Sequence, residues 1–454
     1  MEVVVIGGGI SGLYTILRLA HHPRFKKSNF TLYEASEDLG GRIKTTYSKE
    51  GIPLNLGAGR FSTKSHLTLY KLMGSLGIRC MDFNYTKLAN YYRGLPIITD
   101  PTKKTNLCSD AKKLYGRETY FESNIFIMNL LEECQKNQLL KSPNLDLHAI
   151  SFKNWILNYS SIQAFDLLNQ LSGYDVISNK LLPADEGLKI LKQHPEVSSG
   201  FLNDTLESTW KQPTEGFGQV IKAIVNKIRD MPNLQLFTKH KVTKIKKQGN
   251  KYRLYIDGVD NKNICLKADL IFLTLAANSI SKVELSPSIS NIRQIFSGVV
   301  QVPLFKLFLH FPKNWWEQYV VTKKDFLIIN EGPERKFYFS NHKNEVMIYN
   351  DSDDAVWMYQ QFCINQEKIV SYLNNKLASL FGLSKIPQIP NNIKYYFWEA
   401  GVSFWRINTQ KEKLDSIKEK HAANNLYIIS DMITESPGWI NSTLESIDEL
   451  IDTM

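Results

Sequence analysis

Three glycines near the start of the chain have a spacing that suits phosphate binding. Gly7, Gly9 and Gly12 form a GxGxxG pattern directly after the apolar run VVVI. In this pattern the first glycine permits a tight turn, the second lets the backbone approach a pyrophosphate, and the third allows a helix to pack closely on a strand. A GxGxxG pattern alone is a weak signal, so its meaning depends on the elements that flank it.

Both flanks of the glycine pattern fit a nucleotide site. Ile10 and Ser11 open the segment ISGLYTILRLAHH, whose apolar residues recur at helical spacing. The first N–H groups of such a helix can face a phosphate. Glu34 ends the next apolar run, FTLYEA, where a carboxylate can accept hydrogen bonds from ribose hydroxyls. We therefore predict a dinucleotide site on a strand–helix–strand unit.

The segment LGGRIKT, shortly after Glu34, narrows the choice of dinucleotide. NAD-binding units do not require Gly40, Gly41 and Arg42 here, whereas these residues resemble the second fingerprint of the flavin amine oxidase family. The resemblance implies that this loop lies against the diphosphate and ring edge of FAD. It also implies an α/β fold with a Rossmann-type FAD-binding domain, a β-sheet substrate domain and a helical insertion, the amine oxidase (GR2-like) architecture.

The segment LNLGAGRF resembles the LGxMR region of L-amino acid oxidases within that family. Arg60 stands at the arginine that clamps the substrate carboxylate in those enzymes, and Gly57, Ala58 and Arg60 are expected to border FAD as well. A guanidinium offers a planar fork of donors that matches a carboxylate. The alternative is a structural arginine that caps the following helix or pairs with an acid.

Two further side chains are catalytic candidates by the same resemblance. Lys282, in LTLAANSISKVELSPSI, matches the lysine that holds a water against flavin N5. Burial would lower the pKa of such an ammonium group and suit it to proton transfer. The segment ERKFYFSNHKN resembles the strand whose tyrosine gives a second carboxylate contact; Tyr338 is the candidate, with neighbouring positions open. The alternatives are a solvated lysine at a hairpin edge and a core tyrosine.

The segment LYIISDMITESPGWINSTLES resembles the family's YFAGE...HGWIDST segment, which closes the flavin site. It implies that Gly438, Trp439 and Ile440 lie at the pyrimidine edge of the flavin, with the Trp439 indole beside the substrate. Asp431 would accept hydrogen bonds from FAD hydroxyls. Val242, in KHKVTKI, would meet the adenine through its backbone.

Two departures from the family pattern affect the predicted site. Val402 stands where monoamine oxidases carry the cysteine that bonds to the flavin, so we expect non-covalent FAD. Ile429, Ser430 and Asp431 replace Ala-Gly-Glu, which removes a glycine and shortens the carboxylate arm. These replacements keep open a flavin-binding protein with degraded catalysis.

The segments that must position these residues alternate along the chain. Short apolar runs flank the nucleotide motifs, helical spacing dominates from Leu107 to His194, and β-rich segments follow. The predicted parts are an FAD-binding domain (1–60, 215–285 and 420–454), a substrate-binding domain (61–106 and 286–419) and a helical insertion (107–214).

Composition excludes several other classes of protein. The 454 residues suffice for more than one core, and the net charge of +10 is spread in short basic pairs, so no nucleic-acid partner is expected. The 5 cysteines form no metal-ligand spacing, and no metal is expected. No apolar run reaches the length of a membrane span, and Met1 is followed at once by a strand with no signal peptide. We therefore expect a soluble, cytoplasmic protein without membrane contact; homodimerisation stays open.

The sequence thus predicts an FAD-dependent oxidase that removes hydride from the Cα of an L-amino acid. Its partners would be the small-molecule substrate and dioxygen, and its products an imino acid that hydrolyses to a keto acid, ammonia and hydrogen peroxide. Two alternatives remain: oxidation of a monoamine or polyamine, and flavin binding with degraded catalysis.

Overall fold

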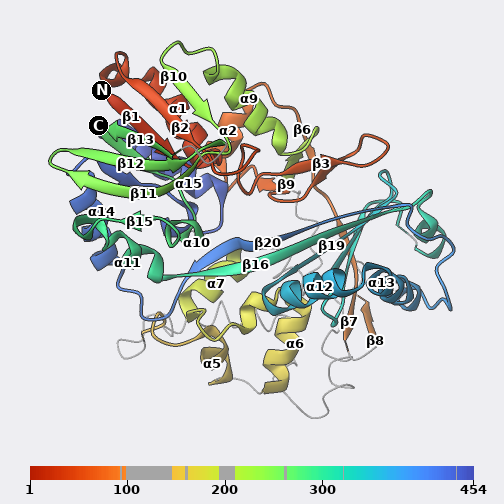
Figure 1. The fold of residues 1–454 in the computed structure, drawn as a ribbon. Helices are drawn as coiled ribbons and strands as arrows, with labels where there is room; N and C mark the ends of the chain where they lie inside the picture. Colours follow the sequence, from red (N-terminus) through yellow and green to blue (C-terminus); the bar gives the residue numbers. More distant parts are fainter. Residues whose placement is uncertain are drawn as a thin grey trace.

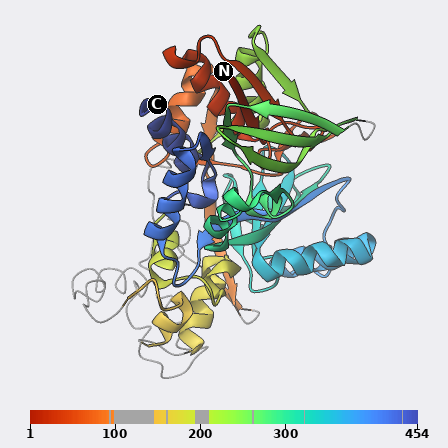
Figure 2. The ribbon, with the colours of Figure 1, turned by 60° about the vertical axis from the view of Figure 1, so that its left-hand side comes forward.

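A computed structural model describes residues 1–92, 95–98, 146–158, 162–193, 210–259, 263–320, 322–435 and 437–454. The helical segment predicted at 122–140 lies outside these residues. Figure 1 and Figure 2 show both termini at one end of the molecule, with helices α5, α6 and α7 at the opposite end. Between these ends lie two main layers of sheet.

A five-stranded parallel sheet carries the GxGxxG pattern. The strand order is β10 (Leu234–Phe237), β2 (Asn29–Tyr33), β1 (Glu2–Ile6), β14 (Leu270–Leu273) and β21 (Leu426–Ile428). Each pairing is parallel. The strands are short apolar runs because both faces of the sheet are covered. This sheet and helix α1 (Ile10–His21) form the predicted Rossmann-type unit.

The two faces of the parallel sheet have different covers. Val3 and Val5 pack in a core with helices α1, α2 (Leu67–Ser75), α9 (Gly218–Ile228) and α15 (Ile440–Asp452). Val4 and Ile6 pack against a four-stranded sheet. That sheet contains β13 (Asn263–Ala268), β12 (Lys251–Asp257), β11 (Lys241–Gln248) and β15 (Glu284–Leu285). Helices α10 (Ala277–Ile280), α11 (Ile292–Ser297) and α14 (Lys411–Ala422) lie on the same side.

A seven-stranded mixed sheet forms the second layer, with the long strands β16 and β20 side by side (Figure 1). Its order is β20 (Asn392–Trp405), β16 (Val299–His310), β19 (Glu345–Asp351), β18 (Lys336–Ser340), β17 (Phe326–Ile329), β7 (Thr86–Tyr92) and β8 (Leu95–Ile98). Alternate residues face opposite sides, as in any pleated strand. Phe305 and Leu307 pack against helices α12 (Ser352–Ile364) and α13 (Gln366–Leu380). Leu304, Lys306 and Phe308 face a cavity instead.

The described part of the predicted helical insertion is mostly helical. It contains α5 (Phe152–Leu157), α6 (Ile162–Ser172) and α7 (Ala184–Gln193), which share a core with Val302 and Phe404 of the seven-stranded sheet. Its last residues differ from the prediction, because β9 (Trp210–Pro213) pairs with β5 (Phe61–Ser62) and β6 (Cys80–Asp82). The remaining elements are the hairpin β3 (Thr45–Tyr47) and β4 (Pro53–Asn55) and the 3₁₀ turns Pro23–Phe25, Asp175–Ser178, Pro287–Ile289, Trp315–Tyr319 and Asp431–Ile433.

Candidate active site

A cavity of about 1060 Å³ is lined by both main sheets. The residues that follow the carboxyl ends of β1, β2, β14 and β21, namely Gly7, Glu34, Thr274 and Ser430, all line it. In open α/β sheets this edge is where ligands bind. The volume exceeds the upper end of the range of about 300–1,000 Å³ for small-ligand sites, which leaves room for a dinucleotide and a substrate.

The glycines after β1 are required by close backbone contacts. A Cβ atom on Gly12 would lie 2.0 Å from the Gly7 carbonyl oxygen, and Gly7 itself has a φ of +112°. The Gly9 Cβ position is open, with 3.9 Å to its nearest neighbour, the Gly41 Cα. The turn therefore needs glycine for its shape at two positions and presents bare backbone at the third.

The two predicted fingerprints contact each other. The Gly40 N–H donates a hydrogen bond to the Gly8 carbonyl (2.8 Å), and Gly9 and Gly40 form a parallel β-bridge. A Cβ on Gly41, whose φ is +57°, would lie 3.3 Å from the Gly9 Cα. Residues about thirty positions apart thus form one glycine-lined surface beside the cavity.

The start of helix α1 and Glu34 complete this surface. Gly9 is the N-cap and has no side chain to cap the first N–H groups of the helix, while Ile10 and Ser11 line the cavity. Glu34 accepts hydrogen bonds from the Gly8 N–H (2.6 Å) and the Ser36 N–H (2.8 Å). The glycine cradle, the helix N-terminus and a carboxylate fit the phosphates and ribose of a dinucleotide. Val242, 5% exposed, lines the same cavity from β11.

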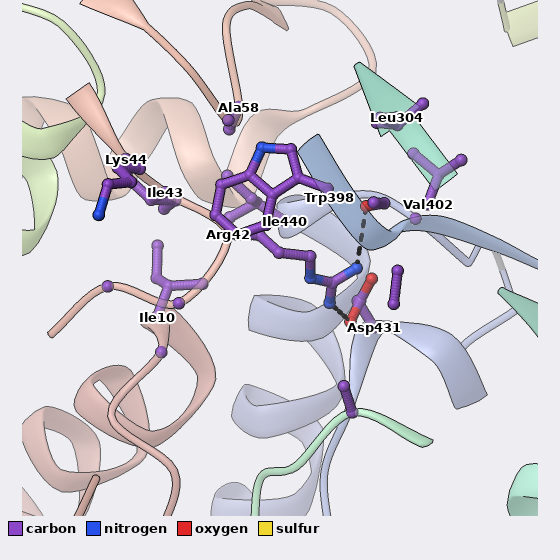
Figure 3. Close-up of a pocket in the computed structure, with 18 of the residues that line it drawn as sticks. Ile10, Arg42, Ile43, Lys44, Ala58, Leu304, Trp398, Val402, Asp431 and Ile440 are labelled. Atoms are coloured by element: carbon purple, nitrogen blue, oxygen red, sulfur yellow. Dashed lines mark hydrogen bonds and ion pairs between the residues drawn. The ribbon is translucent and has the colours of Figure 1, made fainter. Parts of the chain in front are cut away.

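Arg42 and Asp431, both predicted to contact the cofactor, form an ion pair beside the cavity (Figure 3). Arg42 also donates to the Gly401 carbonyl at 3.2 Å. Asp431 is buried, so the guanidinium supplies the compensating charge that a buried carboxylate needs. The pair holds the second fingerprint against the segment that follows β21.

Ser430 replaces a family glycine without backbone strain. Its φ of −159° is extended and open to any residue, and its hydroxyl accepts a hydrogen bond from the Met432 N–H at 3.3 Å. Ser430 is buried and lines the cavity. The replacement therefore changes the chemical surface offered to a ligand and leaves the chain path ordinary.

The predicted carboxylate clamp lies in an aromatic part of the cavity. The Arg60 guanidinium carbon lies 4.8 Å from the ring centroid of Trp210 and 5.4 Å from that of Phe83, and Nη2 donates to the Tyr174 hydroxyl at 3.3 Å. The Trp439 ring lies 5.9 Å from Trp210. Low-dielectric surroundings of this kind strengthen charge interactions.

The other residues near the clamp come from separate elements. Gly438 has a φ of +88°, and Gly438, Trp439 and Ile440 line the cavity before and at the start of α15. Tyr338, 4% exposed on β18, lines it as well. Its ring lies 6.3 Å from the Phe83 ring, so one aromatic side chain separates it from Arg60. The structure thus brings together Arg60, Tyr338 and Trp439.

Lys282 also lines the cavity but is exposed, so the expectation of a buried ammonium at this position is wrong. Lys282 lies two residues after the short helix α10, which follows strand β14 of the parallel sheet. Among the described lysines that line the cavity, Lys306 in the middle of β16 is the buried one. Its Nζ donates to the carbonyls of Asn55 (3.1 Å) and Gly57 (2.5 Å). Burial, with the nearby charge of Arg60, lowers the pKa of Lys306 to about 7.

The comparisons with known proteins identify the family. A family model of flavin containing amine oxidoreductases matches residues 10–446. The chain belongs to this family. It is therefore an FAD-dependent oxidoreductase, and the glycine cradle, Glu34 and the cavity volume fit that cofactor. Val402 lines the cavity (Figure 3), which is compatible with non-covalent binding.

Relatives by sequence span nearly the whole chain. An L-amino-acid oxidase of Echis ocellatus is 22% identical, and the match covers 98% of this chain and 87% of that enzyme. An uncharacterized protein of Acanthamoeba polyphaga mimivirus is 19% identical, with 99% of this chain and 93% of the relative covered.

Solved structures of putrescine oxidase share the fold. A triple mutant of that enzyme gives a TM-score of 0.73 at 16% identity, covering 100% of this chain and 99% of the other. The putrescine-bound wild type gives 0.72 at 15% identity, covering 100% of this chain and 99% of the other. These matches confirm the predicted architecture.

Sequence reasoning missed three residues of this amine oxidase cavity. Lys306 interrupts the apolar run LFKLFLHF, and that lone charge among core residues is a signal that could have found it. Trp398 lines the cavity and donates from Nε1 to the Leu56 carbonyl at 2.8 Å. Glu345, the first residue of β19, is buried at the cavity wall, and no motif marks it.

The described residues contain neither a metal-binding cluster nor a membrane-spanning helix. No group of three or more His, Cys, Asp or Glu side chains in them could hold a metal ion. In the same part of the chain, every helix is too short or too polar for a membrane span.

Proposed function

We propose that this amine oxidase family member oxidatively deaminates an L-amino acid. The overall reaction converts the amino acid, water and dioxygen into a keto acid, ammonia and hydrogen peroxide. The observation that carries the proposal is Arg60, a guanidinium among aromatic rings at the cavity. The L-amino-acid oxidases among the relatives, matched over 98% of this chain, support the same substrate class.

Arg60 would bind and orient the substrate carboxylate. Its hydrogen bond to the Tyr174 hydroxyl and its position over the Trp210 ring hold the planar fork in place. The rings of Phe83 and Trp439 would exclude water from the bound carboxylate, which raises the strength of the pair. Tyr338 lies on the other side of the Phe83 ring from Arg60 and would give the substrate a second contact.

Lys306 would act as the general base that takes a proton from the substrate amine. The substrate amine must lose a proton before the Cα–H bond can break, and a general base works best with a pKa near the operating pH. Lys306 has a pKa of about 7, so an appreciable fraction of its amine is neutral near pH 7. The carbonyls of Asn55 and Gly57 fix its Nζ, which can accept a proton directly or through a held water.

Bound FAD would supply the redox chemistry, as acceptor of the Cα hydride and donor of electrons to dioxygen. Within the cradle, Gly7, Gly9 and the start of α1 would hold its diphosphate, and Glu34 its ribose. Arg42 and Asp431 lie where the second fingerprint meets the cavity. The chain itself contributes orientation, charge and exclusion of water.

An anaerobic substrate screen tests the proposal. The purified flavoprotein is mixed with L-amino acids and with amines that lack a carboxylate, and bleaching of the flavin absorbance is followed. We expect bleaching by at least one L-amino acid. In Arg60→Ala, kcat/KM for amino acids should fall about 100-fold or more, because the charge pair with the substrate carboxylate is lost.

Amines without a carboxylate should lose little rate in the same variant, and the exposed Arg79→Ala is the matched control. Bleaching by amines and by no amino acid would show that the substrates are amines without a carboxylate, and would contradict the proposal. No bleaching by any amine or amino acid would leave a flavin-binding protein without this catalysis.

A further inference from the structure

A buried carboxylate lines the cavity away from Arg60. Glu345 is only 4% exposed and begins β19, opposite Ser340 of β18 and His310 of β16. Met347 and Tyr349 follow on the same face of the strand and also line the cavity. Within the described part of the chain, the Glu345 Oε2 atom has no hydrogen-bond partner.

An unpartnered buried carboxylate is costly to the folded protein. Leaving such a group without a partner destabilises the folded protein, and more so when the group is charged. Burial raises the pKa of Glu345 to about 7, while Lys343 and His342 favour the charged form and Asp325 opposes it. A cation bound in the cavity beside this carboxylate would offset this cost. The carboxylate is thus suited to a positively charged ligand.

The position of Glu345 relative to the proposed reaction centre sets the length of that ligand. The Lys306 Nζ lies 5.6 Å from the Tyr349 ring, and Arg60 is close enough to lower the pKa of Lys306. Tyr349 follows Glu345 by four positions on β19, which is about 13 Å between backbone positions in an extended strand. Only a long substrate side chain would span this part of the cavity.

The wall between the two ends suits a methylene chain. Arg60 lies beside the Phe83 ring, which is 4.9 Å from the Tyr85 ring. Tyr85 lies 5.1 Å from Tyr338, and all three rings line the cavity together with Met347. Glu345 lies two positions before Met347, the pairing partner of Tyr338, so Arg60 and the carboxylate lie at opposite ends of this row of rings.

We propose that Glu345 binds the cationic end of the substrate side chain, so that the preferred substrates are long basic L-amino acids, L-lysine and L-arginine. This inference rests on the proposed function. Arg60 takes the anionic head of such a substrate and Glu345 its distal ammonium or guanidinium. A diamine carries the same distal cation without the carboxylate, and the experiment separates the two sources.

The test compares L-lysine with L-norleucine, which has the same chain length and no distal amine. In the wild-type holoenzyme, anaerobic flavin bleaching should give a kcat/KM for L-lysine about 10- to 100-fold above that for L-norleucine. In Glu345→Gln this ratio should fall to near one, with the L-norleucine rate kept. Glu412→Gln, an exposed carboxylate on α14, is the matched control. The series from 2,4-diaminobutyrate through L-ornithine to L-lysine should rise with length.

Equal rates for L-lysine and L-norleucine in the wild type, or an unchanged ratio in Glu345→Gln, would overturn the inference and leave the proposed function standing. If cadaverine bleaches the flavin and no amino acid does, both the inference and the proposed function fail. A Glu345→Gln variant that binds flavin and retains L-norleucine activity shows that a lost ratio reflects recognition and not misfolding.

Discussion

The two halves of the cavity are built from different parts of the polypeptide. On the parallel-sheet side, the cavity surface is formed mainly by backbone: the loops at Gly9 and Gly40 are in contact, and the start of α1 lines the cavity. On the seven-stranded side, the cavity surface is formed by side chains. Lys306, Tyr338 and Glu345 come from three strands that lie side by side in the sheet. A site made of backbone leaves a compact glycine pattern in the sequence, whereas a site made of side chains is assembled by register.

The largest effect is expected where backbone is tightest. In Gly12→Ala the new Cβ would lie 2.0 Å from the Gly7 carbonyl oxygen, so the turn must open and the cradle is lost. We expect purified protein with little or no bound flavin, measured by its absorbance after desalting. Gly74→Ala, in α2 with open space around the Cβ position, is the control and should keep its flavin. Normal flavin content in Gly12→Ala would contradict the proposed cradle.

A side-chain change on the other half should leave the cofactor bound and remove the chemistry. Lys306→Met should lower kcat about 100- to 10,000-fold, the usual contribution of a positioned general base, with flavin content unchanged. A fall of less than about 10-fold would remove Lys306 from proton transfer.

The same variant should be more stable. Well below pH 7 both folded and unfolded Lys306 carry the proton, so the cost of its buried charge is present in full. That cost is relieved as pH rises from about 7 toward the ordinary lysine value of 10.5. Lys306→Met should therefore raise the free energy of unfolding by roughly 1–3 kcal/mol at neutral pH. In urea melts of flavin-free protein, the difference should shrink as the pH approaches 10; a difference that grows with pH would contradict the depressed pKa.

A smaller effect sharpens the link between the two charges. The Arg60 guanidinium lowers the pKa of Lys306, so Arg60→Met should raise that pKa and move the acid limb of the kcat–pH profile to higher pH, by less than about one unit. Arg60→Lys keeps the charge and should keep the limb near its original pH while KM rises, because the planar fork is lost. Identical limbs in all three proteins would show that Lys306 does not set the profile.

The backbone-built half of the cavity could be predicted from the sequence better than the half built from side chains. Gly7, Gly9, Gly12 and Glu34 could be placed from the sequence because each answers a local backbone requirement. The family resemblance points to Lys282 and does not consider Lys306, because the burial that distinguishes Lys306 is not defined by the sequence of an isolated strand. Burial at Lys306 follows from its pairing with Tyr349 of β19 and with Tyr396 of β20, which are 43 and 90 positions away in the chain.

Other gaps have equally physical causes. Glu345 had no signal, since a glutamate at the start of a strand is ordinarily exposed and only the neighbouring strands bury it. The strand β9 was assigned to a helical insertion because its partners, β5 and β6, lie more than a hundred residues earlier. Domain limits and the roles of the site residues stay predictions.

The alternation along β19 bears on how this enzyme's selectivity can change. Val346 and Ile348 pack toward α12 and α13, while Glu345, Met347 and Tyr349 face the cavity. Substitutions at the three cavity positions can therefore remodel the chamber with little disturbance of the core beneath it. A combinatorial library restricted to them should yield many folded variants of differing selectivity, so this single strand is a natural unit of evolutionary and engineered change.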